Sequence, residues 1–259
     1  MLIKMLIKVV NKLRNLMLIV EYDGTCYHGW QRQQNAVTVQ EVLEKALQVI
    51  MKEDIAVTGC SRTDAGVHAR GFVCNFFTHT NIPADRVPYA LNSVLPDDVV
   101  ILSCHHMQED FHARYHARSK KYRYRIINRT FPSPFEKHYA CHFPYALDVD
   151  KMIKATKFLE GQHDFRAFMA TGSMVKDTVR NIFEVSITQN NAEIRIDITG
   201  DGFLYNMVRI IAGTLIYVGI GKIGVSDISE IIACKDRKKA GITAPPQGLY
   251  LMEVRYGDE

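Results

Sequence analysis

The sequence has 259 residues, of which 47% are apolar and 23% charged, the balance of a globular protein with one large or two ordinary domains. No apolar run approaches the roughly 20 residues that a membrane span needs. The net charge of +4 and the pI of about 8.6 permit an anionic partner but do not require one.

Six cysteines are spread along the chain without the close pairs of a disulfide scaffold or a zinc site, so we expect reduced thiols in a cytoplasmic protein. Residues 1–15 form a basic N-terminal extension. As a helix it would be amphipathic, which is typical of an organellar address or a surface anchor. We favour a weakly ordered extension from an upstream start codon, because Met17 stands at the start of the first convincing strand.

Apolar periodicity predicts strands and helices in alternation along the first half of the chain. Thr38 to Glu41 form a capping box, and the apolar residues after it share one helical face up to Ile50. A second, shorter helix is predicted at 83–95. The predicted strands are 16–22, 55–59, 72–78, 99–107 and 117–128.

The second half begins with Pro132 and Pro134, which make residues 128–135 a predicted domain junction or exposed loop. Asn190-Asn191 between two alternating segments is a hairpin signal. Helices are predicted at 148–160, at 203–218 and, capped by Ser226, up to Cys234; strands are predicted at 178–188, 192–199 and 249–256.

This order of elements indicates the α+β class. We expect two domains, at 16–128 and 129–259. Each would hold a mainly antiparallel sheet flanked by helices, in the manner of RRM-like or ferredoxin-like halves.

The most informative segment is the polar loop from Gly59 to Ala69, which lies between two apolar strands. Loops between rigid strands are common positions for catalytic groups. Arg62 stands two residues before Asp64, and an ionised, positioned aspartate can act as a nucleophile or a base. The simpler alternative, commoner on residue patterns alone, is an Asx-turn at Asp64 with Arg62 as a surface partner.

The segment Ser61-Arg62-Thr63-Asp64-Ala65-Gly66-Val67-His68 resembles the signature loop of the TruA family of tRNA pseudouridine synthases. Further matches to this family, in its order, are Glu21 to Gly24, His28 to Gln31, Asp110 to Arg114, Lys121 to Tyr124, Asn206 to Arg209, Lys235 to Arg237 and Gly248 to Leu251. The resemblance covers about residues 16–256. One departure is Ser61, where many members of the family have glycine.

The resemblance implies that Asp64 is the nucleophile that converts a uridine of tRNA into pseudouridine, by attack at ribose C1′ or at C6 of the base. It implies no cofactor and no metal. Arg62 belongs to the active-site loop, Tyr122 matches a tyrosine that stacks on the target base, Arg209 matches the partner of the aspartate, and Leu249 matches an apolar wall. The implied substrate region is the anticodon stem-loop, at positions 38–40, and the implied assembly is a cytoplasmic homodimer.

Residues 114–125 support an RNA partner independently, since they contain six Lys or Arg residues and no acid. Basic groups bind phosphates and aromatic rings stack on unpaired bases. In a strand, Arg118 and Lys120 share a face with Tyr122, so we predict that both bind substrate. The alternative is a solvated edge strand that its charge protects from aggregation.

Three other interpretations are weaker. His112 and His116 have helical spacing but lack the glutamate of a zinc peptidase between them, so no metal site is predicted. Residues 70–76 partly echo an RNA-binding sequence pattern, which would suit a noncatalytic module. A nucleoside glycosidase would also use a carboxylate, but it usually needs a second one as acid.

Overall fold

The computed structural model describes residues 12–172 and 175–257. Its strands are β1 Arg14–Tyr22, β2 Thr58–Gly59, β3 His68–Thr78, β4 Val99–Met107, β5 Ser119–Asn128, β6 Cys141–Phe143, β7 Gly161–Asp164, β8 Val179–Asn190, β9 Glu193–Gly200 and β10 Leu249–Arg255. Its α-helices are α1 Val39–Met51, α2 Val87–Asn92, α3 Val149–Thr156, α4 Met207–Gly219 and α5 Asp227–Cys234.

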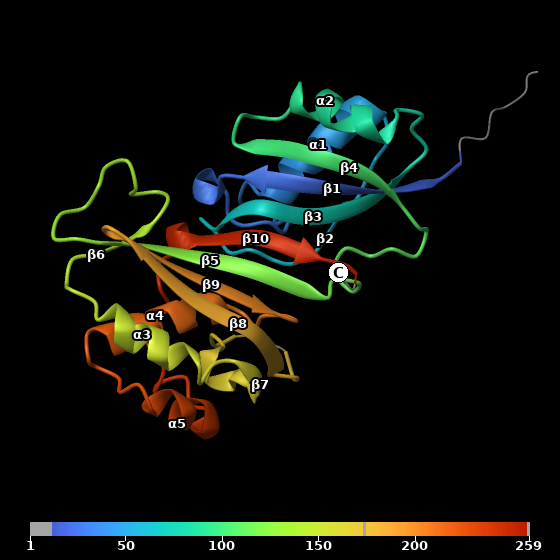
Figure 1. The fold of residues 1–259 in the computed structure, drawn as a ribbon. Helices are drawn as coiled ribbons and strands as arrows, with labels where there is room; N and C mark the ends of the chain where they lie inside the picture. The colour runs from blue at the N-terminus through green and yellow to red at the C-terminus, as the bar shows by residue number, and fades with distance from the viewer. Residues whose placement is uncertain (1–11, 173–174, 258–259) are drawn as a thin grey trace, which may run out of the picture.

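The described strands form one sheet in the order β4-β1-β3-β10-β5-β9-β8-β7, with β2 beside β3 and β6 beside β5 (Figure 1). Most neighbours are antiparallel, and the two parallel pairs are β10 with β3 and β5 with β6. The predicted α+β class with a mainly antiparallel sheet is therefore confirmed. Because the last strand of the chain lies between β3 and β5, the two halves share this sheet, and the domain boundary at residue 128 stays a prediction.

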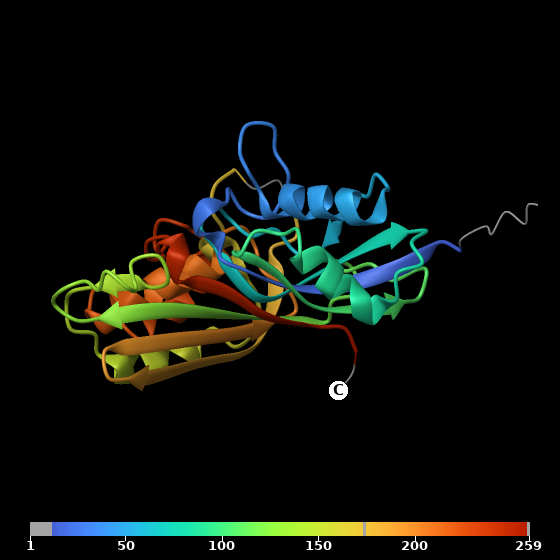
Figure 2. The same cartoon turned by 90° about the horizontal axis from the view of Figure 1, so that it is seen from above.

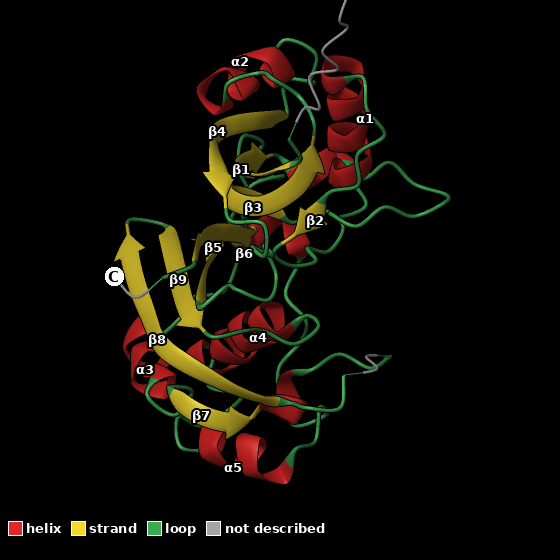
Figure 3. Ribbon diagram, turned by 90° about the vertical axis from the view of Figure 1, so that its right-hand side faces the viewer, coloured by secondary structure: helices red, strands yellow, loops and turns green. Residues whose placement is uncertain are grey.

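Helices cover the sheet in two groups. In Figures 2 and 3, α1 and α2 lie over β1, β3 and β4, whereas α3, α4 and α5 lie with the strands of the second half. Thr38 caps the start of α1: its Oγ1 accepts a hydrogen bond from the Glu41 amide at 3.4 Å, as predicted. The reciprocal half of the capping box is absent, because the Glu41 carboxylate binds Lys45 at 2.6 Å.

Several predicted elements differ from the observed ones. The strand at 55–59 shrinks to Thr58–Gly59, because side chains of α1 occupy the backbone of Val57: its amide donates to Glu44 and its carbonyl accepts from Gln40. The helix at 83–95 is a short 3-10 turn followed by α2. Ser226 precedes α5 without a side-chain capping bond, so its predicted role is wrong. The hairpin of β8 and β9 is confirmed, with Asn191 in the left-handed region at φ +52°.

The structure excludes one of the two interpretations of the basic segment at 114–125. β5 lies in the interior of the sheet, paired with β10 and β9, so the edge-strand alternative is wrong. On one of its faces Arg123 and Arg125 bind Asp197 and Glu193 across the β5–β9 pair, at 2.7 and 2.6 Å. The side chains of those two arginines are therefore engaged in ion pairs within the sheet.

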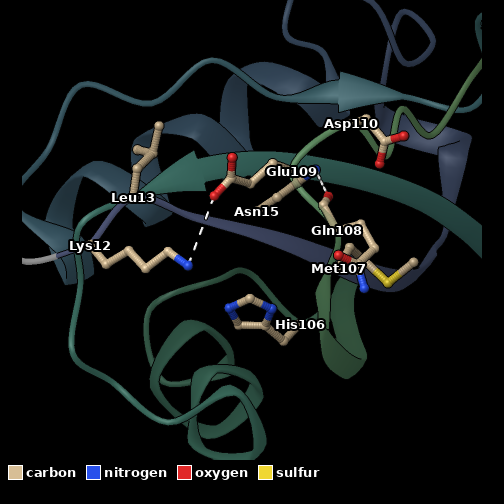
Figure 4. Close-up of a pocket in the computed structure, with 8 residues that line it drawn as sticks. All are labelled: Lys12, Leu13, Asn15, His106, Met107, Gln108, Glu109 and Asp110. Carbon is tan, nitrogen blue, oxygen red and sulfur yellow. Dashed lines mark hydrogen bonds and ion pairs between the residues drawn. The ribbon is translucent and has the colours of Figure 1, made fainter.

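A hollow of about 480 Å³ lies beside the start of β1 and the end of β4 (Figure 4). Lys12 faces Glu109 across it at 3.9 Å, but both side chains are more than four-fifths exposed, where an ion pair contributes little. Most of the predicted N-terminal extension, residues 1–11, falls outside the described residues. Of the helices in the described ranges, none has the length and apolar character to cross a membrane.

Candidate active site

The loop between β2 and β3 is held at Thr63. The Tyr22 hydroxyl lies 2.8 Å from the Thr63 hydroxyl, and the Trp30 amide donates to the Thr63 carbonyl at 3.2 Å. Gly29 permits this approach, since a Cβ there would lie 2.3 Å from the Thr63 oxygen and its φ is +85°. These contacts fix the backbone immediately before Asp64.

Asp64 is paired with an arginine from the other half of the chain. Arg209 Nη1 donates to Asp64 Oδ2 at 3.0 Å, a charge-assisted hydrogen bond. The Asp64 side chain is 27% exposed, so it can still be reached from solvent. Within the described residues no hydrogen bond reaches Oδ1, which leaves one carboxylate oxygen available. The loop neighbour Arg62 is exposed and forms no described ion pair with Asp64.

A backbone segment beside α4 positions Arg209. Ala244 accepts a hydrogen bond from Arg209 Nε at 2.7 Å, and its amide donates to the Arg209 carbonyl at 3.1 Å. The segment can approach α4 because residue 213 is glycine: a Cβ there would lie 1.9 Å from the Ile242 carbonyl oxygen.

Arg237 supports the same segment by donating to the Gly241 carbonyl at 2.8 Å, and burial lowers the pKa of its guanidinium. Arg237 is half-buried, whereas the neighbouring Lys235, Lys238 and Lys239 are exposed.

Tyr122 on β5 lies under the loop. Its ring is 6% exposed and meets the edge of Phe203 at a centroid distance of 5.1 Å. Its hydroxyl lies 3.2 Å from Ser61 Oγ, so the serine that departs from the family's glycine contacts this tyrosine. Burial raises the pKa of the Tyr122 phenol, and the nearby Asp64 carboxylate adds to the rise. The phenol is therefore neutral near pH 7.

Lys120 and Arg118, the two predicted phosphate contacts, have different surroundings. Lys120 Nζ donates to the Cys60 carbonyl at 2.8 Å, at the start of the Asp64 loop, and burial lowers the pKa of its ammonium group. Arg118 is exposed before β5 begins and does not line the cleft that contains Asp64.

The cleft has a volume of about 1030 Å³ and runs between the Asp64 loop, β5 and the start of α4. Leu249 forms part of its wall. Its basic lining residues are Arg32, Arg62, Arg114, Lys120 and Arg209, whereas Asp64 is the only carboxylate among the described residues that line it. The surface is suited to a polyanion, and its described residues include no second carboxylate of the kind that a glycosidase would use.

His112, one of the two histidines considered as metal ligands, has a different contact in the structure. His112 Nδ1 accepts the backbone amides of Arg114 and Tyr115, at 3.1 and 3.3 Å, so it stabilises a turn. Across 12–172 and 175–257, no three His, Cys, Asp or Glu side chains are grouped so that they could hold a metal ion. All six cysteines are free, and four are buried.

Comparison with known proteins identifies the family. Residues 18–116 and 155–257 match the family described as tRNA pseudouridine synthase. The chain belongs to this family. Its members convert uridine in tRNA to pseudouridine, so this tRNA pseudouridine synthase is an isomerase, and neither the noncatalytic module nor the glycosidase is supported.

Curated relatives of this pseudouridine synthase cover nearly the whole chain. A protein named tRNA pseudouridine synthase A from Thermoanaerobacter sp. (strain X514) is 54% identical over 244 residues, which are 94% of this chain and 100% of the relative. Proteins of the same name from Ruminiclostridium cellulolyticum and Acetivibrio thermocellus are 54% and 52% identical, again over 94% of this chain and 100% of theirs.

Sequence reasoning gave no role to Asn206, Ala244 or Phe203, although Asn206 stands in a matched motif. Asn206 Oδ1 accepts from Arg209 Nη1 at 2.7 Å. The only available signal was its position three residues before Arg209, which places two residues on one face of a helix. No sequence pattern could indicate Ala244, because it contacts Arg209 through its backbone carbonyl, a group that every residue has.

Matched substitutions should distinguish the roles of Lys120 and Arg118. Lys120→Met should leave the Cys60 carbonyl unpaired at about 1–3 kcal/mol, and thus lower both the melting temperature and the rate of pseudouridine formation. Arg118→Met should leave the melting temperature unchanged and flatten the dependence of log affinity for tRNA on log salt by roughly 0.7–0.9. Thermal melts and filter binding at several salt concentrations measure both effects. A Lys120→Met variant with parental stability would show that the Cys60 contact is dispensable.

Proposed function

We propose that Asp64 is the catalytic nucleophile of this tRNA pseudouridine synthase, and that it acts on positions 38–40 of the anticodon stem-loop. The observation that carries the catalytic assignment is the held carboxylate: Asp64 is the only acid among the described lining residues of a basic cleft, and Arg209 occupies one of its oxygens. The substrate position rests on the family resemblance. So does the proposal of a cytoplasmic homodimer in which both subunits contact one tRNA.

The proposed reaction begins with Asp64 Oδ1, which attacks ribose C1′ or C6 of the uracil. The bond between N1 and C1′ then breaks, and the uracil turns while it remains bound. C5 then forms the new bond to C1′, and the bond from Asp64 to C1′ or C6 breaks, which regenerates the carboxylate. C5 loses its proton, and N1 gains a proton. One bond replaces another without net loss of electrons or atoms, so the balance requires no redox partner and no co-substrate.

Neighbouring residues support this chemistry in separate ways. The Tyr122 ring provides a stacking surface for the extruded base. We propose that its hydroxyl, which lies next to Ser61, takes part in moving the C5 proton. Leu249 provides an apolar wall, while Arg62, Lys120 and Arg118 bind the RNA.

Because the proposed reaction needs neither a metal nor a nucleotide, activity should survive exhaustive EDTA treatment. The assay is release of tritium from [5-³H]uridine-labelled tRNA, since C5 loses its hydrogen only when pseudouridine forms. The control is the same tRNA with EDTA and matched excess Mg²⁺, which separates enzyme chemistry from tRNA folding. A loss of activity that one transition metal restores would contradict the cofactor-free proposal.

Asp64→Asn should lower the single-turnover rate by at least about 10³-fold, because the amide keeps the size of the side chain but loses its nucleophilic charge. Binding of tRNA and the melting temperature should change little. Asp85→Asn is the matched control, since Asp85 is exposed on another surface. Mapping of pseudouridine in digested tRNA, before and after treatment, tests the substrate positions. Turnover within tenfold of the parent would remove Asp64 from its proposed role.

Substitutions at Tyr122 should separate stacking from proton transfer. Tyr122→Phe should retain tRNA binding, and should lose about 10²–10⁴-fold in rate only if the hydroxyl moves the C5 proton. Tyr122→Leu should lose base positioning as well, since stacking is worth about 1–3 kcal/mol per base. Tyr115→Leu is the control, because Tyr115 is 75% exposed and lies outside the cleft. A Leu variant with reduced stability but a normal rate per folded molecule would mean that Tyr122 is only a core residue.

A further inference from the structure

Asn206, the residue before α4, has an unusual backbone. Its φ of +60° and ψ of 8° lie in the left-handed region, which residues other than glycine seldom adopt, although asparagine tolerates it best. An asparagine at this position ordinarily has an extended backbone, and its side chain accepts an amide of the first helical turn. The Asn206 side chain makes no such capping bond. Its polar group is therefore used for another purpose.

That purpose is a contact with the arginine that binds Asp64. Asn206 Oδ1 accepts a hydrogen bond from Arg209 Nη1 at 2.7 Å, and the same nitrogen donates to Asp64 Oδ2 at 3.0 Å. Both hydrogens of Nη1 are thereby engaged. Together with the bond from Nε to the Ala244 carbonyl, three of the five guanidinium hydrogens have fixed acceptors within the described chain.

Three acceptors in different directions fix the plane of a guanidinium group. This matters in a cleft that receives RNA, because phosphates are strong competing acceptors for arginine. With only Asp64 and Ala244 as partners, Arg209 could turn one nitrogen toward a phosphate and leave the carboxylate without its partner. Asn206 holds the nitrogen that faces Asp64, and the two hydrogens on Nη2 remain for the substrate.

We propose that Asn206 is a positioning residue for the isomerisation: it holds Arg209 in the orientation that orients Asp64. This inference rests on the proposed catalytic role of Asp64. It gives the residue with the left-handed backbone before α4 a function in the reaction, in addition to its place at the start of the helix.

The test is Asn206→Gly, because glycine adopts the left-handed backbone without strain and removes only the side chain. We expect the single-turnover rate with tRNA to fall roughly 10- to 100-fold, the effect of losing a hydrogen bond to a charged group. KM for tRNA and the melting temperature should stay close to parental values. Asn191→Gly is the matched control, since Asn191 has φ +52° in the β8–β9 hairpin. It should leave rate, KM and stability unchanged.

A second background shows whether the effect passes through Arg209. Arg209→Lys keeps the charge but loses the planar fork. If Asn206 acts by orienting the guanidinium, adding Asn206→Gly to Arg209→Lys should change the rate by less than about twofold, because residues that act through one contact are not additive. A residue important only for folding would show its full effect in both backgrounds.

The outcomes also separate this inference from the proposed function. An Asn206→Gly enzyme with the parental rate, beside an inactive Asp64→Asn enzyme, overturns the positioning role and leaves Asp64 in place. An equal loss of rate in the parent and in the Arg209→Lys background overturns it as well. Substantial turnover by Asp64→Asn overturns the proposed function itself.

Discussion

The ion pair between Asp64 and Arg209 joins residues 145 positions apart in the sequence. One comes from the loop between β2 and β3, and the other from the first turn of α4. Neither element can place its side chain alone, so the pair depends on how the two halves meet. β10 provides that junction: it pairs with β3 on one side and β5 on the other, and it brings the loop over the strand that carries Tyr122.

Side-chain and backbone hydrogen bonds hold the residues that surround each partner. Thr63 is fixed by Tyr22 and Trp30 before Asp64, and Ala244 is fixed along α4 beside Arg209. A charge held partly out of water is unfavourable unless its hydrogen bonds are satisfied. The Arg209 side chain is 14% exposed, and three acceptors engage three of its five guanidinium hydrogens. Such a site is ordered before substrate arrives, so binding energy need not be used to order it.

Sequence patterns predicted the local elements well and the contacts between them poorly. The strand at 99–107 was predicted with its observed bounds, because its alternation expresses the burial of one face. The strand at 55–59 failed because Glu44 and Gln40, on a different element, occupy its backbone. In the site, proximity along the chain suggested Arg62 as the partner of Asp64. Spacing does not specify the direction of a loop side chain, and Arg209 was indicated only by the family resemblance.

The two faces of β5 carry different kinds of side chain, and this difference helps to determine which residues line the cleft. Tyr122 pairs with Leu251 on one side and Ile198 on the other, so it faces an apolar layer, while Arg123 faces Asp197 on the opposite surface. A slip of one residue would exchange these faces and bury Arg123 among aliphatic side chains, without its carboxylate. The ion pairs of Arg123 and Arg125 therefore favour one register. That register presents Tyr122 and Lys120 to the Asp64 loop, so charges outside the cleft help to determine which residues line it.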